Sequence, residues 1–433
     1  MTYAILFIGA VLFLGQMFSF LFEKTRLPDV LPLMVLGMII GPGLQIVTPD
    51  MFGSAGEIFT TLALIVVLFE SGIDFKVSSL RGAVGQGLLL TTVCFVLVGV
   101  VVSFAVHWTL GLPLMASFII GSIVANNSAA IIVPMLAKLK IADNTKTILF
   151  LEANLTGVYS IVVALALLGV LVKGEAVSAG LVGLQIVKSF GIGILFALAA
   201  GLFWMGVLNR IRRMENAVSL TFAFVLLVYG ASELLGGDGA IATLTFGIVA
   251  GNIRLFSRLW LKKFEFKGVA LNAEERVFFD ELEFIFKTLF FVYMGICMRI
   301  GEWQFVAAGA LLAAVKLLVR WPVVDLCTSK KISRTDASVL LAMCPNGLVS
   351  AVLAAMVAQQ LPGDGGAVQD VIYSVIFFSV IFSNLMSFRI EKGGLKWLAD
   401  GAFTRHEAAA VPSPDPALQP APAPDGAQEQ NPS

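Results

Sequence analysis

Charged residues are scarce in this chain. Only 13% of its 433 residues are Asp, Glu, Lys or Arg, against roughly 25% in a soluble domain, and the charges sum to zero. The scarcity excludes an ordinary soluble domain. The lack of a basic surplus argues against a nucleic-acid partner.

Residues that bind metals or form disulfides are also few. The four cysteines include no CxxC pair, and the two histidines, His107 and His406, lie far apart in sequence. We therefore expect no metal and no cofactor, and we interpret the cysteines as packing residues. A phosphate-binding glycine loop and a nucleophile–base pair are missing too, so the sequence predicts no enzyme.

Apolar residues are abundant: they make up 58% of the chain, and the mean hydropathy is +0.92. Runs of this kind predict an all-α polytopic membrane protein with about 13 transmembrane helices. We interpret the first run as a retained helix, not a signal peptide. The predicted spans are 3–22, 28–48, 55–73, 83–107, 113–137, 147–172, 182–208, 217–235, 239–253, 279–298, 304–326, 337–360 and 370–390.

The basic residues predict the orientation of these spans. Alternate connections, with the segment after the last span, hold 23 of the 29 Lys and Arg residues, whereas the opposite connections hold only Lys173 and Arg299. Such a bias predicts an outside N-terminus and a cytoplasmic C-terminus in a bacterial inner membrane. The long basic connection between spans 9 and 10 predicts an amphipathic interfacial helix. We expect a transmembrane domain over 1–400 and a disordered Pro/Ala-rich cytoplasmic tail over 401–433.

Two predicted spans are interrupted by polar or helix-breaking residues. Span 5 contains Asn126-Asn127-Ser128, and span 12 contains Pro345-Asn346-Gly347. The offset of seven spans predicts an inverted repeat of spans 1–6 and 8–13, with span 7 as linker. Paired interrupted helices point to a transporter binding site, although each alone could be an ordinary kink.

A carboxylate occupies the middle of span 6. An ionisable residue at such depth costs about 2.5–3.5 kcal/mol, so Glu152 is expected to be paired or functional. Thr156 lies four residues further on the same helix face. Both side chains could therefore face Asn127 and Ser128, whose oxygen atoms suit a hard monovalent cation.

Several motifs resemble the monovalent cation:proton antiporter superfamily, in its NhaP and sodium/proton exchanger branch. The resemblance covers nearly all of residues 1–392. The motifs that carry it are Leu31-Pro32 through Gly37 to Gly41-Pro42-Gly43, Leu68-Phe69-Glu70-Ser71-Gly72-Ile73-Asp74, Glu152, Phe290-Phe291 with Gly295, and Pro345-Asn346-Gly347-Leu348.

The resemblance implies a thirteen-helix inverted repeat that exchanges sodium, potassium or lithium for protons by alternating access. It implies that spans 4–6 and 11–13 form a mobile core. Spans 1–3 and 8–10 would form a scaffold that makes a homodimer in the lipid bilayer.

Three ionisable positions of that family are neutral here. Thr156 and Gly157 stand where the family has Asn-Asp, whose Asp binds cation and proton in turn. The family has Thr-Asp in span 5. Those two positions are Asn127-Ser128 in this chain, or Asn126-Asn127 if the alignment is shifted by one residue. Asn346 replaces an Arg. The site is thus rebuilt around a different charge balance.

Proton coupling needs a titratable group, and the sequence offers Glu70 and Glu152. The resemblance implies that Arg320, four residues after Lys316, pairs with Glu152, which would make Glu152 a structural ion pair. Glu70 is either on a cation path or a helix cap. Antiport is the leading hypothesis; the alternatives are a transport-inactive scaffold or sensor and an uncoupled cation conductor.

Overall fold

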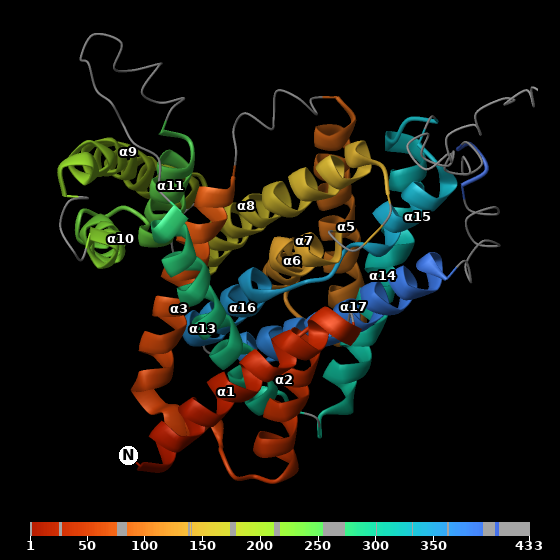
Figure 1. The fold of residues 1–433 in the computed structure, drawn as a ribbon, viewed down its shortest axis with the longest axis horizontal. Coiled ribbons are helices and arrows are strands. Elements are labelled where there is room, and N and C mark those ends of the chain that lie inside the picture. The colour runs from red at the N-terminus through yellow and green to blue at the C-terminus, as the bar shows by residue number, and fades with distance from the viewer. Residues whose placement is uncertain are drawn as a thin grey trace, which may run out of the picture.

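The computed structural model describes residues 2–25, 28–75, 85–136, 139, 141–173, 179–211, 217–253, 273–299, 301–330, 332–361, 363–392 and 403–406, which form a helical bundle (Figure 1). The helices are α1 (Thr2–Thr25), α2 (Val30–Met38), η1 (Ile39–Gly43), η2 (Pro49–Phe52), α3 (Gly53–Asp74), α5 (Gln86–Leu110), α6 (Leu114–Val124), α7 (Ala129–Leu136), α8 (Asp143–Lys173), α9 (Ala179–Ile211), α10 (Ala217–Leu234), α11 (Gly239–Gly251), α13 (Ala273–Cys297), α14 (Trp303–Cys327), α15 (Arg334–Ala342), α16 (Leu348–Gln360) and α17 (Asp364–Glu391).

The helices follow the apolar runs of the sequence. Each predicted span falls on one helix or on two consecutive elements. Among the described residues, six helical stretches are long and apolar enough to cross a membrane. The predicted class, a helical polytopic membrane protein, is therefore confirmed. The expected interfacial helix between spans 9 and 10 lies outside the described residues. Of the tail expected over 401–433, the structure describes only 403–406, where Phe403 and His406 are buried.

Two helices are broken where the sequence places polar residues and proline. Residues 125–128 separate α6 from α7, and residues 343–347 separate α15 from α16. Asparagine and serine offer the backbone alternative hydrogen bonds, and Pro345 lacks an N–H and disfavours a helical residue before it. Figure 1 shows α6, α7 and α16 in the middle of the molecule, with α9 and α10 at one side and α14 and α15 at the other.

Glycine pairs let two sets of helices approach closely. A Cβ atom added to Gly37 of α2 would lie 2.8 Å from the Cα atom of Gly295 on α13. A Cβ added to Gly72 of α3 would lie 2.8 Å from the Cα of Gly247 on α11. Small residues at such contacts are typical of membrane helices, whose association depends on close packing.

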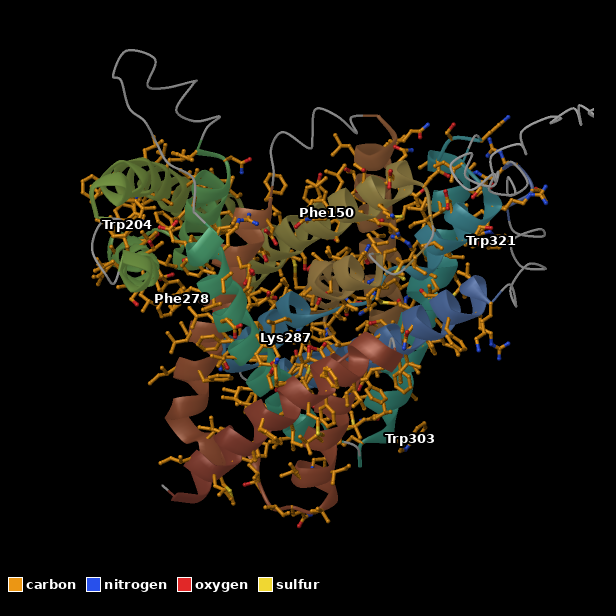
Figure 2. The ribbon with its side chains drawn as sticks, viewed as in Figure 1. Phe150, Trp204, Phe278, Lys287, Trp303 and Trp321 are labelled. Carbon is orange, nitrogen blue, oxygen red and sulfur yellow. The ribbon has the colours of Figure 1, made fainter. Side chains whose placement is uncertain are left out.

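Ion pairs connect helices outside this packing. Lys287 of α13 donates to Asp29, just before α2, at 2.8 Å; its place on the bundle is seen in Figure 2. Arg299, after α13, pairs with Asp370 of α17. The hydrogen bond to Asp370 raises the pKa of the Arg299 guanidinium. Trp303, at the start of α14, is 76% exposed, as expected for a residue at a membrane surface (Figure 2).

Candidate functional site

The two helix breaks lie against each other. The Ser128 amide donates to the Pro345 carbonyl at 2.8 Å, and the Asn126 Nδ2 atom donates to Ser350 Oγ at 3.1 Å. Asn126, Ser128 and Pro345 belong to the breaks, and Ser350 lies in the first turn of α16. Backbone groups that the broken helices leave unpaired are therefore satisfied partly by the opposite break.

Asn346 is the main link between the two breaks. Its Nδ2 group lies 3.1 Å from Ile123 O, 3.1 Å from Val124 O and 3.0 Å from Asn126 O. Ile123 and Val124 are the last two residues of α6, and Asn126 lies in the break, where the regular pattern of helical hydrogen bonds stops. The backbone N–H of Asn346 donates to Ser379 Oγ at 3.0 Å. Asn346 itself is 1% exposed.

A buried lysine occupies the centre of this arrangement. The Lys316 Nζ atom donates to Asn126 O at 2.7 Å and to Asn346 Oδ1 at 2.8 Å, one oxygen from each break. Lys316 is 2% exposed, and within the described part of the chain it forms no ion pair with a carboxylate. Neutral oxygen atoms thus hold an ammonium group that burial destabilises.

Glu152 of α8 pairs with Arg320, one turn beyond Lys316 on α14. The Arg320 Nη1 atom donates to Glu152 Oε1, and Nη2 lies 2.6 Å from Oε2. The Nε and Nη2 atoms also donate to the Leu340 carbonyl of α15, at 2.9 and 2.8 Å. The pair therefore joins three helices, and its two charges cancel. The ammonium of Lys316 is left as the excess charge of the cluster.

The residues of span 6 lie against the first break. The backbone N–H of Asn127 donates to Thr156 Oγ1 at 3.1 Å, and its side-chain Nδ2 atom donates to Glu152 Oε1 at 3.0 Å. The Oδ1 atoms of Asn126 and Asn127 are buried and have no hydrogen-bond partner within the described residues. A Cβ added to Gly157 would lie 3.8 Å from Asn126 Oδ1. A side chain at position 157 would therefore reach this free oxygen.

The structure brings together nearly all the residues singled out in the sequence, with one exception. Glu70, near the end of α3, lines a separate pocket with Asp74, Arg276 and Asp280, and no residue of the two breaks lines that pocket. Arg276 pairs with Asp74 at 3.7 Å. The carboxylate of Glu70 thus belongs to the α3–α13 interface.

Sequence reasoning missed the two serines that complete the crossing. Ser350 accepts from Asn126 and from Asn346 and donates to Ile123 O at 3.2 Å, and Ser379 accepts from Asn346. Ser350 lies four residues after Asn346 at the start of an apolar helix. That spacing, one turn from the break, is the signal that could have identified it.

Two helix breaks that lie against each other around buried ionisable groups, inside a bundle of apolar helices, define a polytopic membrane protein of the transporter class. Residues 9–390 match the family described as "Sodium/hydrogen exchanger, transmembrane". The chain belongs to this family.

Curated relatives of the chain are named antiporters. Na(+)/H(+) antiporter 1 of Methanocaldococcus jannaschii is 24% identical over 380 residues, which is 83% of this chain and 84% of that protein. K(+)/H(+) antiporter NhaP2 of Shewanella sp. (strain MR-4) is 25% identical over 235 residues. That match covers 53% of this chain and 40% of the relative, so it extends over less than half of the longer protein.

Solved structures share the fold. The structure of the sodium proton antiporter MjNhaP1 from Methanocaldococcus jannaschii at pH 8 superposes with a TM-score of 0.71 at 22% identity. The superposition covers 93% of this chain and 99% of that chain. The likeness shows a common helical architecture.

Proposed function

We propose that this protein exchanges a monovalent cation, Na⁺ or K⁺, for protons by alternating access. Its membership of the exchanger family and its antiporter-named relatives support this function over a transport-inactive scaffold and over an uncoupled conductor. The observation that carries the proposal is the capture of the Lys316 ammonium by oxygen atoms from both helix breaks.

In this mechanism, Lys316 and the transported cation compete for the same oxygen atoms. Proton loss from Lys316 removes one positive charge and releases Asn126 O and Asn346 Oδ1. A monovalent cation then restores both the charge and the coordination, since hard cations prefer oxygen ligands. The free Oδ1 atoms of Asn126 and Asn127 are available as further ligands. One proton is thereby exchanged for one cation without a carboxylate at Gly157.

Glu152 takes a structural role in this proposal. Its two oxygens are both engaged by Arg320, and removal of its charge would leave a buried guanidinium without a counter-ion. The Thr156-Gly157 pair, where the family has Asn-Asp, leaves room beside Asn126 Oδ1. The neutral residue at position 157 and the buried ammonium of Lys316 are compatible with one cation site that works without a carboxylate.

The proposed architecture has thirteen spans, with spans 1–6 and 8–13 as inverted repeats and spans 5 and 12 crossing. The glycine contacts support it, because exchange of the two repeats turns the α2–α13 pair into the α11–α3 pair. We further propose a homodimer in a bacterial inner membrane, with the N-terminus outside and the C-terminus cytoplasmic, and with residues 401–433 as a cytoplasmic tail.

The experiment is cation-driven proton flux out of liposomes that contain the purified protein in their membrane and a pH-sensitive dye in their lumen. Addition of Na⁺ or K⁺ should move protons in the wild type and fail to do so in Lys316→Gln. Lys188→Gln is the control, because Lys188 of α9 is exposed. A wild-type response no larger than that of empty liposomes would indicate the scaffold or sensor. A cation flux that does not depend on pH would indicate the uncoupled conductor. Exchange at the wild-type rate in Lys316→Gln would exclude Lys316 as the proton carrier.

A further inference from the structure

The helices around the site are joined to one another by polar contacts. Arg320 of α14 connects Glu152 of α8 to the Leu340 carbonyl of α15. The backbone N–H of Asn346, in the second break, donates to Ser379 of α17 at 3.0 Å. Together with the two breaks, α8, α14, α15 and α17 therefore form one bonded set, the site helices.

A second set of helices is joined by ion pairs away from the site. Lys287 of α13 donates to Asp29, just before α2, at 2.8 Å. Arg276, in the first turn of α13, pairs with Asp74 of α3 at 3.7 Å. These three helices, α2, α3 and α13, are the support helices.

The ion pair of Arg299 and Asp370 connects the two sets. Arg299 lies in the short connection that leads from α13 to α14, and Asp370 lies in the second turn of α17. The Arg299 Nε atom donates to Asp370 Oδ2 at 2.7 Å, and Nη1 donates to Glu302 Oε1, just before α14, at 2.9 Å. The guanidinium also lies 5.8 Å from the ring centre of Phe305 in α14. One side chain thus holds the joint between the support helices and the site helices.

The pair closes one end of the bundle. The side chain of Asp370 is 6% exposed and that of Arg299 is 50% exposed, so water reaches the pair from one side only. Arg299 lies beyond the opposite end of α13 from Arg276, and Trp303 marks this end of the molecule in Figure 2. On the predicted outer side, the connections hold only Lys173 and Arg299 as basic residues. An arginine is unusual on that side, and its bond to a buried carboxylate gives it a reason to be there.

We propose that Arg299 and Asp370 form a gate latch, which keeps the site closed at this end and breaks each time the site opens there. The inference rests on the proposed exchange by alternating access, in which the site opens to each side in turn. Because the two breaks are bonded to the site helices, opening moves these helices relative to the support helices. While Arg299 holds Asp370, α17 stays against the end of α13. The two residues act on the position of the helices and are not ligands of the cation.

A native cysteine can report the opening of the latch. Cys297, the last residue of α13, faces the same interface, because the charge of Asp370 acts on its thiol. The rate of its labelling by N-ethylmaleimide is measured on the purified protein in lipid nanodiscs. The background has Cys327 replaced by serine, and Cys94 and Cys344 are buried. This readout does not depend on transport.

Loss of either member of the latch should expose Cys297. We expect Arg299→Gln and Asp370→Asn each to raise the labelling rate about fivefold, the factor that corresponds to loss of an interaction of about 1 kcal/mol. A direct effect of charge on the thiol would shift the two variants in opposite directions, since they remove opposite charges. Lys287→Gln is the matched control: it breaks an ion pair within the support helices and should leave the rate unchanged. Rates that stay at the wild-type value in both latch variants, or that shift in opposite directions, would overturn the proposal.

A reversible cross-link tests the latch during transport. Arg299→Cys and Asp370→Cys are combined in a background with Cys297 and Cys327 replaced by serine. The two new thiols are joined by a reducible bis-methanethiosulfonate linker with a short spacer. We expect the linked protein to exchange at least about tenfold more slowly in liposomes, and dithiothreitol to restore the rate, because a gate that cannot open stops the cycle.

The matched control places the same linker within one set of helices. Asp29→Cys with Lys287→Cys joins α13 to the residue before α2, and the linked protein should exchange at the rate of its reduced form. Unimpaired exchange by the protein linked between positions 299 and 370 would overturn the latch. A wild type that moves no protons would refute the proposed exchange, and the labelling rates of Cys297 would then decide the latch on their own.

Discussion

The change of Glu152 to glutamine tests whether this carboxylate holds the core together. The substitution removes the carboxylate that pairs with Arg320, whose side chain is 2% exposed. Among the described residues, the guanidinium would then keep the Leu340 carbonyl and a neutral amide as partners. Loss of one member of a buried ion pair costs about 3–5 kcal/mol. That cost corresponds to a decrease in the folding equilibrium constant of about a hundredfold to several thousandfold.

A second variant separates stability from transport. In Glu152→Leu with Arg320→Met, no charge is left uncompensated, and replacement of a buried pair by apolar residues is often neutral or stabilising. The lost donors to Leu340 O reduce the benefit by about 1–3 kcal/mol. We therefore expect the double variant to recover about 2 kcal/mol of the single-variant loss, which is the difference between the middle values of the two ranges.

Both variants are measured in two assays. Unfolding by SDS in mixed micelles, followed by circular dichroism, gives the free energy of unfolding. Proton flux in liposomes gives exchange. A double variant that is stable and still exchanges would support the structural role of Glu152. A double variant as stable as the wild type but without exchange would refute it, because Glu152 would then take part in proton transfer.

Two further substitutions test the site and the packing. Asn346→Asp places a carboxylate within reach of the Lys316 Nζ atom, and this carboxylate should keep the ammonium charged. We therefore expect the rate of exchange in liposomes to fall at least about tenfold. An unchanged rate would contradict the mechanism in which Lys316 and the cation compete. Gly72→Ala places a methyl group against Gly247 and should lower the free energy of unfolding in SDS by about 1–3 kcal/mol. Gly230→Ala is the control: nothing lies within 4 Å of its added Cβ atom, so its free energy of unfolding should be unchanged or slightly higher. Equal stability of the two alanine variants would argue against close helix contact.

The helices could be predicted from the sequence because the membrane restricts the chain so strongly. A spanning segment must satisfy its own backbone, so apolar runs indicate helices almost directly. The breaks were also predictable, since Asn126-Asn127-Ser128 and Pro345 weaken a helix locally. The end of α6 at Val124 and the start of α16 at Leu348 follow from those residues.

The partners within the site were harder to predict. The sequence places Lys316 and Asn346 in different spans, and only the crossing brings an oxygen of each break to one ammonium group. The sequence offers both Glu70 and Glu152 as titratable groups, because both are intramembrane carboxylates. Glu70, however, lies near the end of α3 and lines a pocket that contains no residue of the two breaks. Such distinctions depend on long-range packing, which neither periodicity nor local propensity encodes.

The single amide of Asn346 has a mechanical consequence. The two N–H bonds of this side-chain NH₂ group are shared among the carbonyls of Ile123, Val124 and Asn126, so sliding one broken helix past the other would weaken several buried hydrogen bonds at once. Any motion that carries cargo across the bilayer should therefore displace both broken helices as one rigid piece, with flexibility confined to the surrounding interfaces.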